Sequence, residues 1–185
     1  MKILTMIRWL FLTMLLSLSL SVSSTSYATQ TYMPWHTDEE YARNASESFK
    51  RDKEIRCLAL NLFHESRDQG TEGWLAVAFV TINRVIDDRF PDTICEVVWE
   101  PKQFSWTHDG LSNKPDLSKY PDRKSWEYIL EFSRGFYDNY EYIDDPTQGS
   151  LYYHSTDVEP FWRDSFEIAA EIGEHIFYIN RGRYR

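Results

Sequence analysis

The stretch IRCLALNLFHESRDQ at residues 55–69 decides how this chain folds. Apolar residues stand at positions 55, 58, 59, 62 and 63, the i, i+3, i+4, i+7, i+8 spacing of an amphipathic helix. At 100° per residue, Glu65 falls within about 20° of Leu58, at the edge of the apolar stripe, whereas His64 falls on the far side. The spacing therefore predicts a core helix that carries a partly desolvated carboxyl, Glu65, near its end.

A carboxyl in that position has a specific chemical use. Apolar surroundings disfavour its charged form and raise its pKa, so that Glu65 can act as a general acid near neutral pH. Protonation of a bridging oxygen is the step that cleavage of a glycosidic bond requires. The alternative is an ion pair of Glu65 with Arg67 or Arg84, which would lower the pKa of Glu65 instead.

The segments further along the chain predict a mainly helical single domain. The apolar run Trp74–Val80 indicates a second, buried helix, and Asp122–Tyr137 has the pattern of a third. Apolar residues alternate from Phe166 to Ile172, and Gly173-Glu174 can turn the chain back, which favours a hairpin. The expected fold class is α+β, mainly α, with a small antiparallel β-hairpin near the C-terminus.

The first 28 residues have the features of a secretory signal peptide: early basic residues, the apolar run Trp9–Leu20, and small residues up to Ala28. A helix of those twelve residues would reach about 18 Å, short of the roughly 30 Å hydrocarbon layer. We therefore expect export to a periplasm, with no stable membrane span after processing. An uncleaved anchor is the alternative. The expected organisation is signal peptide 1–28, leader and polar helix 29–50, and catalytic domain 51–185.

The charge of the chain argues against nucleic acid as a partner. The formal net charge is −9, and cleavage after Ala28 would remove two basic residues and leave −11. Nucleic-acid binding draws its affinity mainly from Lys and Arg, and no basic stripe offsets this acidity.

Export makes the two cysteines, Cys57 and Cys95, candidates for a disulfide. Closing a loop of about 38 residues would stabilise the fold by about 3 to 4 kcal/mol in the chain-entropy model. Two buried free thiols are the alternative.

Several ordered motifs carry a resemblance to a known family. They are CLALNLFHESR (57–67), EGWLAVA (72–78), NRV (83–85), RFPDTIC (89–95), QFS (103–105) and DPTQGSLYY (145–153). The chain resembles the SleB/CwlJ group of peptidoglycan-cleaving enzymes over most of its mature length. The resemblance implies a lysozyme-like fold with Glu65, at the start of the family's Glu-Ala-Arg-Gly-Glu stretch, as the catalytic acid. It also implies a protein of bacterial or phage origin that acts in the periplasm or in association with the cell wall.

The chain departs from the family pattern in two places. The helix-end stretch reads Glu-Ser-Arg-Asp-Gln at residues 65–69, so the family's Gly and second acidic residue are replaced. His154-Ser155 stands where the pattern has Tyr and Asn. The resemblance implies four candidate substrate-binding residues in the cleft: Gln103, Phe104, Tyr152 and Tyr153.

The implied reaction cuts the β-1,4 bond between N-acetylmuramic acid and N-acetylglucosamine in peptidoglycan glycan strands, with no cofactor. A lytic transglycosylase needs one carboxyl, which acts as acid and then as base to form a 1,6-anhydro ring. The resemblance favours this outcome, and no second acid stands out beside Glu65. A hydrolytic muramidase stays open, since Asp68, Glu72 or Asp109 could supply a second carboxylate.

Two other classes of protein compete with a glycosidase. A zinc peptidase would need the histidines, but His64, His108, His154 and His175 lack metal-ligand spacing, and we expect no metal. A non-catalytic glycan-binding module would use the aromatic residues without requiring Glu65.

Overall fold

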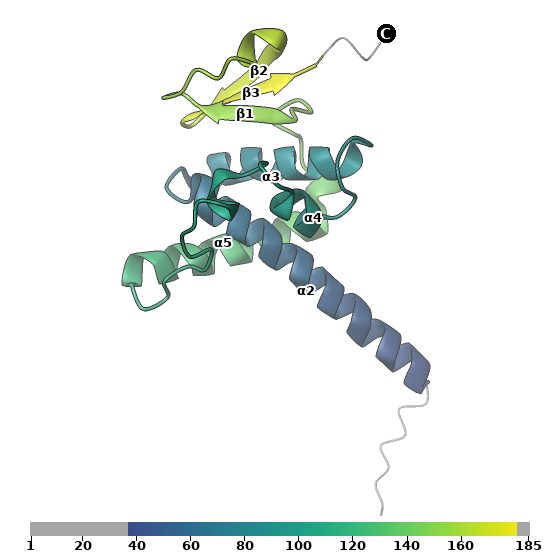
Figure 1. Ribbon diagram of the computed structural model, residues 1–185. Coiled ribbons are helices and arrows are strands. Elements are labelled where there is room, and N and C mark those ends of the chain that lie inside the picture. The colour runs from purple at the N-terminus through teal and green to yellow at the C-terminus, as the bar shows by residue number, and fades with distance from the viewer. Residues whose placement is uncertain (1–36, 181–185) are drawn as a thin grey trace, which may run out of the picture. The chain divides into compact units, whose positions relative to one another are not determined.

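The computed structural model describes residues 37–180 (Figure 1). The signal peptide expected at residues 1–28 and the start of the leader lie outside these residues. The described elements, in chain order, are α2 (Asp38–Ser66), α3 (Gly70–Ile86), α4 (Ile94–Trp99), η1 (Ser105–Thr107), α5 (Tyr120–Asn139), η2 (Tyr140–Tyr142), β1 (Tyr152–Ser155), η3 (Arg163–Ser165), β2 (Glu167–Ile172) and β3 (His175–Ile179). From residue 37 to residue 180, no helix is long and apolar enough to cross a membrane.

Helix α2 joins two segments that the sequence suggested were separate. It runs for 29 residues from Asp38 to Ser66, so the boundary expected at residue 50 falls inside one unbroken helix. Its first half is almost entirely exposed, and burial begins at Ile55, where the apolar spacing begins. The polar half continues the helix because it contains no Gly or Pro, and because its first turn is acidic, which favours a helix N-terminus.

Helices α3 and α5 pack against the C-terminal half of α2. The apolar run predicted to be buried lies at the centre of α3, and Ala76, Val77 and Val80 are inaccessible to solvent. Helix α5 extends the third predicted helix by two residues at each end, and Trp126 and Phe136 face the core as predicted.

A disulfide between Cys57 and Cys95 joins α2 to the short helix α4, with 5.2 Å between the two Cα atoms. The predicted cross-link is therefore present. Thr93 caps α4 by accepting a hydrogen bond from the backbone N–H of Glu96.

The predicted hairpin is present as β2 and β3, and a third strand that the sequence did not predict, β1, pairs with the other edge of β3. All pairings are antiparallel, in the order β1-β3-β2. Phe177 of β3 packs against Ala76 and Val80, which holds the sheet against α3. The α+β, mainly α fold class is confirmed, with a three-stranded sheet in place of a simple hairpin.

Candidate active site

Glu65 lies in the last turn of α2, where the helix ends against α3. The indole Nε1 of Trp74 donates a 3.0 Å hydrogen bond to the carbonyl of Ser66, the final residue of the helix. Gly70 then adopts a φ of +67°, a conformation that glycine tolerates without strain, and α3 begins. The terminus of α2 is thus held in place, and with it the backbone that carries Glu65.

Tyr153 of β1 contacts Glu65 directly. The Tyr153 hydroxyl donates a 2.9 Å hydrogen bond to Oε2 of Glu65. The Tyr153 ring stacks on Phe177, with 5.5 Å between the ring centroids, and meets the edge of His175. The sheet therefore orients the carboxyl that the helix presents.

Burial raises the pKa of Glu65 above its ordinary value, and this effect exceeds two opposing ones, the hydrogen bond from Tyr153 and the charge of Arg84. The alternative of an ion pair is not what the structure shows. Arg67 instead pairs with Asp68 and Asp122. Among the described residues, no guanidinium comes within ion-pair distance of Glu65. The carboxyl is therefore biased toward its protonated form, as a general acid requires.

Arg84 is a buried cation behind this pair, with 5% of its surface exposed. Its Nε donates a 2.9 Å hydrogen bond to the carbonyl of Leu151, and its guanidinium lies over the rings of Phe90 and Phe104. Its Nη1 has no hydrogen-bond partner among the described residues, and burial lowers the pKa of Arg84. The positive charge of Arg84 therefore acts on Glu65 from a distance, and the two side chains form no ion pair.

A cavity of about 340 Å³ opens beside Glu65. It is lined by the end of α2, by the turn into α3, and by Glu174 from the β2–β3 turn. Two further carboxylates, Asp68 and Glu174, therefore line the space that Glu65 faces. Sequence reasoning missed Glu174, because nothing in a hairpin turn indicates which distant helix end it will meet.

Gln69 holds that turn in place. Its Oε1 accepts a 3.1 Å hydrogen bond from the backbone N–H of Glu174. A Cβ at Gly73 or Gly173 would come within 2.5 Å of a Gln69 side-chain atom, so both glycines leave room for this side chain. Gln69 stands where the family pattern has its second acidic residue. The structure shows that the amide keeps an acceptor for the hydrogen bond that joins the sheet to the helix.

His64, which also lines the cavity beside Glu65, packs against Trp106. Their rings stack with 4.4 Å between centroids, and the Trp106 indole donates a 3.3 Å hydrogen bond to Oδ1 of Asn61. Burial lowers the pKa of His64, which favours its neutral form. Within residues 37–180, no group of three or more His, Cys, Asp or Glu side chains could hold a metal ion.

Tyr152 and Tyr153, both cleft candidates, face opposite sides of the sheet, as neighbours on a strand do. Tyr152 packs against Phe90, Trp162 and Phe166, away from Glu65. His154 lies on that same far side, where its Nε2 is 2.8 Å from the Tyr178 hydroxyl. The departure from the family pattern at residue 154 therefore lies on the face of β1 away from Glu65.

The other two cleft candidates lie in the loop after α4. Phe104 is 3% exposed and belongs to the hydrophobic core beneath Arg84. Gln103 is half-buried, and its backbone N–H closes a turn onto the carbonyl of Glu100. Neither residue lines the cavity beside Glu65, and neither do Glu72 and Asp109.

Comparison with known proteins places the chain in a family. The profile of the cell wall hydrolase family matches residues 68–178, beginning three residues after Glu65. A spore cortex-lytic enzyme of Oceanobacillus iheyensis is 31% identical over 125 residues, which are 67% of this chain and 41% of that protein. This chain thus spans less than half the length of that relative.

Two solved structures share the fold. The catalytic domain of the Bacillus cereus SleB protein gives a TM-score of 0.50 at 29% identity, covering 68% of this chain and 89% of that one. The catalytic domain of the germination-specific lytic transglycosylase SleB from Bacillus anthracis gives 0.51 at 30% identity, covering 68% and 93%. These matches confirm the resemblance seen in the motifs. Because the family profile covers more than half of its residues, the chain belongs to the cell wall hydrolase family.

Proposed function

We propose that this protein is a peptidoglycan lytic transglycosylase that cleaves the β-1,4 bond between N-acetylmuramic acid and N-acetylglucosamine. The observation that carries the proposal is the environment of Glu65: a carboxyl with a raised pKa, oriented by Tyr153, beside an open cavity. The names of the relatives support it, since one is a spore cortex-lytic enzyme and another a lytic transglycosylase.

In the first step, protonated Glu65 gives its proton to the glycosidic oxygen as the bond from that oxygen to C1 of the muramic residue breaks. In the second step, the Glu65 carboxylate takes the proton of the muramic 6-hydroxyl, whose oxygen forms the new bond to C1. The products are a 1,6-anhydro-muramic end and a free 4-hydroxyl. Glu65 finishes protonated, so one carboxyl suffices. The Tyr153 hydroxyl holds Oε2 in both steps and stabilises the carboxylate between them.

Hydrolysis is the second candidate, and a specific observation favours it: Asp68 and Glu174 line the same cavity as Glu65. A hydrolase would use one of them to activate water or to stabilise the sugar cation. Both side chains are exposed, but Asp68 pairs with Arg67 whereas no ion pair within residues 37–180 engages Glu174, which makes Glu174 the better placed of the two. A non-catalytic glycan-binding module would use the same cavity without chemistry at Glu65.

The test is digestion of purified murein followed by mass spectrometry of the products. The wild type should release anhydro-muropeptides, and Glu65→Gln should lower turnover by at least about 10²-fold while keeping the fold. Glu72→Gln, which removes an exposed carboxyl outside the cavity, is the matched control and should keep full activity. Full activity of Glu65→Gln would refute the mechanism.

Two further variants and a chelator separate the rival classes. Glu174→Gln and Asp68→Asn should still yield anhydro products if the enzyme is a transglycosylase. Reducing muramic ends that disappear in Glu174→Gln would instead identify a hydrolase. Loss of activity with chelator would point to a metal enzyme, and murein that is bound but uncut would point to a binding module.

We also propose that the protein acts outside the cytoplasm, in the periplasm or at the cell wall, after export through residues 1–28. Peptidoglycan lies in that compartment, and the disulfide between Cys57 and Cys95 suits its oxidising conditions. N-terminal sequencing of the protein from an envelope fraction should find cleavage after Ala28; an intact N-terminus would contradict this.

A further inference from the structure

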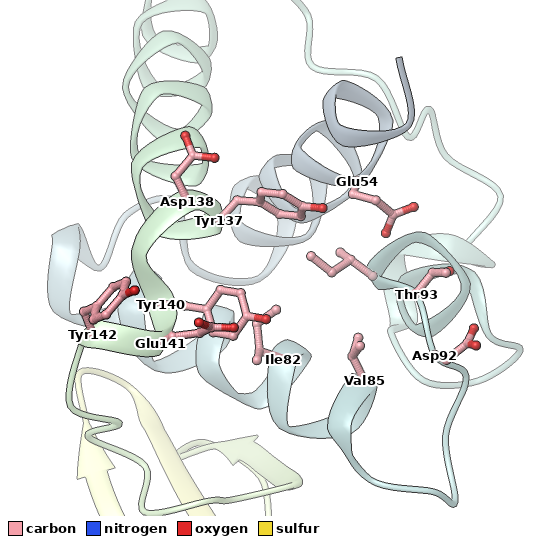
Figure 2. A pocket seen from close by; sticks show the side chains of 11 residues that line it. Glu54, Ile82, Val85, Asp92, Thr93, Tyr137, Asp138, Tyr140, Glu141 and Tyr142 are labelled. Carbon is pink, nitrogen blue, oxygen red and sulfur yellow. The ribbon is translucent and has the colours of Figure 1, made fainter. Parts of the chain in front are cut away.

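A second cavity of the described residues lies away from Glu65. It has a volume of about 450 Å³ and lies where α2, the end of α3, the start of α4 and the end of α5 with η2 meet (Figure 2). Glu54, its contribution from α2, precedes Glu65 by 11 residues, three helical turns or about 16 Å along the axis. The cavity is thus separate from the candidate active site, and nothing in the proposed reaction uses it.

The lining of this cavity combines an apolar floor with aromatic and acidic walls. Ile82, Val85 and Ile94 supply the apolar part. The walls carry three tyrosines and four carboxylates, and no Lys, Arg or His lines the cavity. The aromatic and acidic lining residues are Tyr137, Tyr140, Tyr142, Glu54, Asp92, Asp138 and Glu141. Aromatic faces and carboxylates together are the surroundings in which proteins hold organic cations.

Two of the four carboxylates are already engaged. Glu54 accepts a 3.0 Å hydrogen bond from the backbone N–H of Cys95, and Asp138 accepts one of 3.1 Å from Nε of Arg51. Asp92 and Glu141, both exposed, form no side-chain hydrogen bond or ion pair within residues 37–180. The cavity therefore presents two carboxylates whose charge no nearby cation balances.

Contacts at the edge of the cavity show the same preference for positive charge. The Arg51 guanidinium lies 5.9 Å from the centre of the Tyr137 ring. Burial raises the pKa of the Tyr137 hydroxyl, and the negative charge of Glu54 raises it further. The contribution of Glu54, a negative charge that disfavours a phenolate here, favours a bound cation.

Apolar side chains stand exposed on the residues that continue from the cavity. Tyr142, which lines the cavity, is 86% exposed. Ile143 follows Tyr142 and is 36% exposed. Exposed apolar side chains grouped around a pocket are typical of a surface that contacts another protein.

We propose that this cavity binds the basic side chain, Lys or Arg, of a partner polypeptide, whose neighbouring apolar residues contact Tyr142 and Ile143. Its volume suits the end of a long side chain, with the aliphatic stem on the apolar floor and the charge between the tyrosines, Asp92 and Glu141. A peptidoglycan stem peptide fits less well, because its own carboxylates would meet those of the cavity.

The test is an NMR titration of the full chain with Nα-acetyl-lysine amide and with Nα-acetyl-norleucine amide, which has a similar side chain without the charge. The lysine compound should shift the backbone signals of residues 92–94 and 140–142, and added salt should weaken its binding. The norleucine compound should leave these signals unchanged. Equal binding of the two compounds would overturn the proposal.

Charge variants locate the site. Asp92→Asn/Glu141→Gln should weaken binding of the lysine compound about fivefold or more, because both uncompensated carboxylates are lost. The double control Glu127→Gln/Glu131→Gln makes the same change in net charge on exposed residues of α5 outside the cavity and should bind as the wild type does. Equal effects of the two double variants would overturn the site.

A muropeptide with a free amine that binds this cavity more tightly than the lysine compound would overturn the polypeptide partner and assign the cavity to the substrate. Murein cleavage is not part of any of these measurements, so the outcome is independent of the proposed reaction.

Discussion

The hydroxyl of Tyr153 donates a 2.9 Å hydrogen bond to Oε2 of Glu65 and joins the sheet to the end of α2 at the candidate active site. Burial raises the pKa of Tyr153 well above its ordinary value, so this hydroxyl keeps its proton and acts as the donor. The contact lowers the pKa of Glu65, but burial outweighs it. Tyr153 thus fixes the carboxyl in one orientation without preventing its protonation.

Replacing Tyr153 with Phe should change both the rate and the pH profile. Loss of the hydrogen bond removes an effect that favours the ionised form, so the pKa of Glu65 should rise. The alkaline limb of the kcat/KM profile should move to higher pH, and the rate should fall about tenfold, the scale of a hydrogen bond to a charged group. Tyr152→Phe is the control, because Tyr152 lies on the other face of β1. A Tyr153→Phe profile that matches the wild type would show that the hydroxyl has no part in the reaction.

Replacing Glu65 with Gln should stabilise the fold at neutral pH. A carboxyl whose pKa is raised by folding gives up its proton more readily in the unfolded chain. The wild type therefore loses stability as the pH rises from the ordinary value of 4.5 through the raised pKa. Glu65→Gln lacks this loss. Urea unfolding at several pH values should measure this difference. The free energy of unfolding of the variant should equal that of the wild type below pH 4.5 and exceed it increasingly toward pH 8. An advantage of equal size at every pH would contradict the linkage.

Loss of the disulfide should weaken the fold. Cys57→Ser/Cys95→Ser frees a link across a sequence separation of 38, which should cost about 3 to 4 kcal/mol of unfolding free energy in the chain-entropy model. Denaturant unfolding of the oxidised wild type and the double variant measures this difference. Reductant should lower the stability of the wild type and leave the variant unchanged; equal responses would show that no disulfide forms.

Gly173→Ala should separate the sheet from the helix end. Gly173 has a φ of +60°, and a Cβ there would lie 2.4 Å from Oε1 of Gln69, the atom that binds the N–H of Glu174. We expect a loss of about 2 kcal/mol, from backbone strain and the displaced side chain together. Gly110→Ala is the matched control, because Gly110 has a φ of +79° with nothing near its Cβ, so that only the strain applies. Thermal unfolding compares the two variants, and equal losses would show that the contact with Gln69 contributes nothing.

The helices could be predicted because the spacing of apolar residues along each helix shows which of its faces is buried. The spacing around Leu58, the apolar run at Trp74–Val80 and the pattern of α5 report which faces are buried, whatever they pack against. The strand β1 was missed because Tyr152–Ser155 is too short to show alternation, and its pairing with β3 is a long-range contact.

The sequence by itself determined the core helices and their buried faces, the hairpin of β2 and β3, the two cysteines able to pair, and the carboxyl at the edge of an apolar stripe. All of these follow from local spacing and residue chemistry. Only the tertiary structure decided that Tyr153 rather than Tyr152 contacts Glu65, that Glu174 lines the same cavity, and that Gln69 fits between two glycines. These depend on which surfaces meet, and that is set by packing between segments far apart in the chain, for which local periodicity carries no signal.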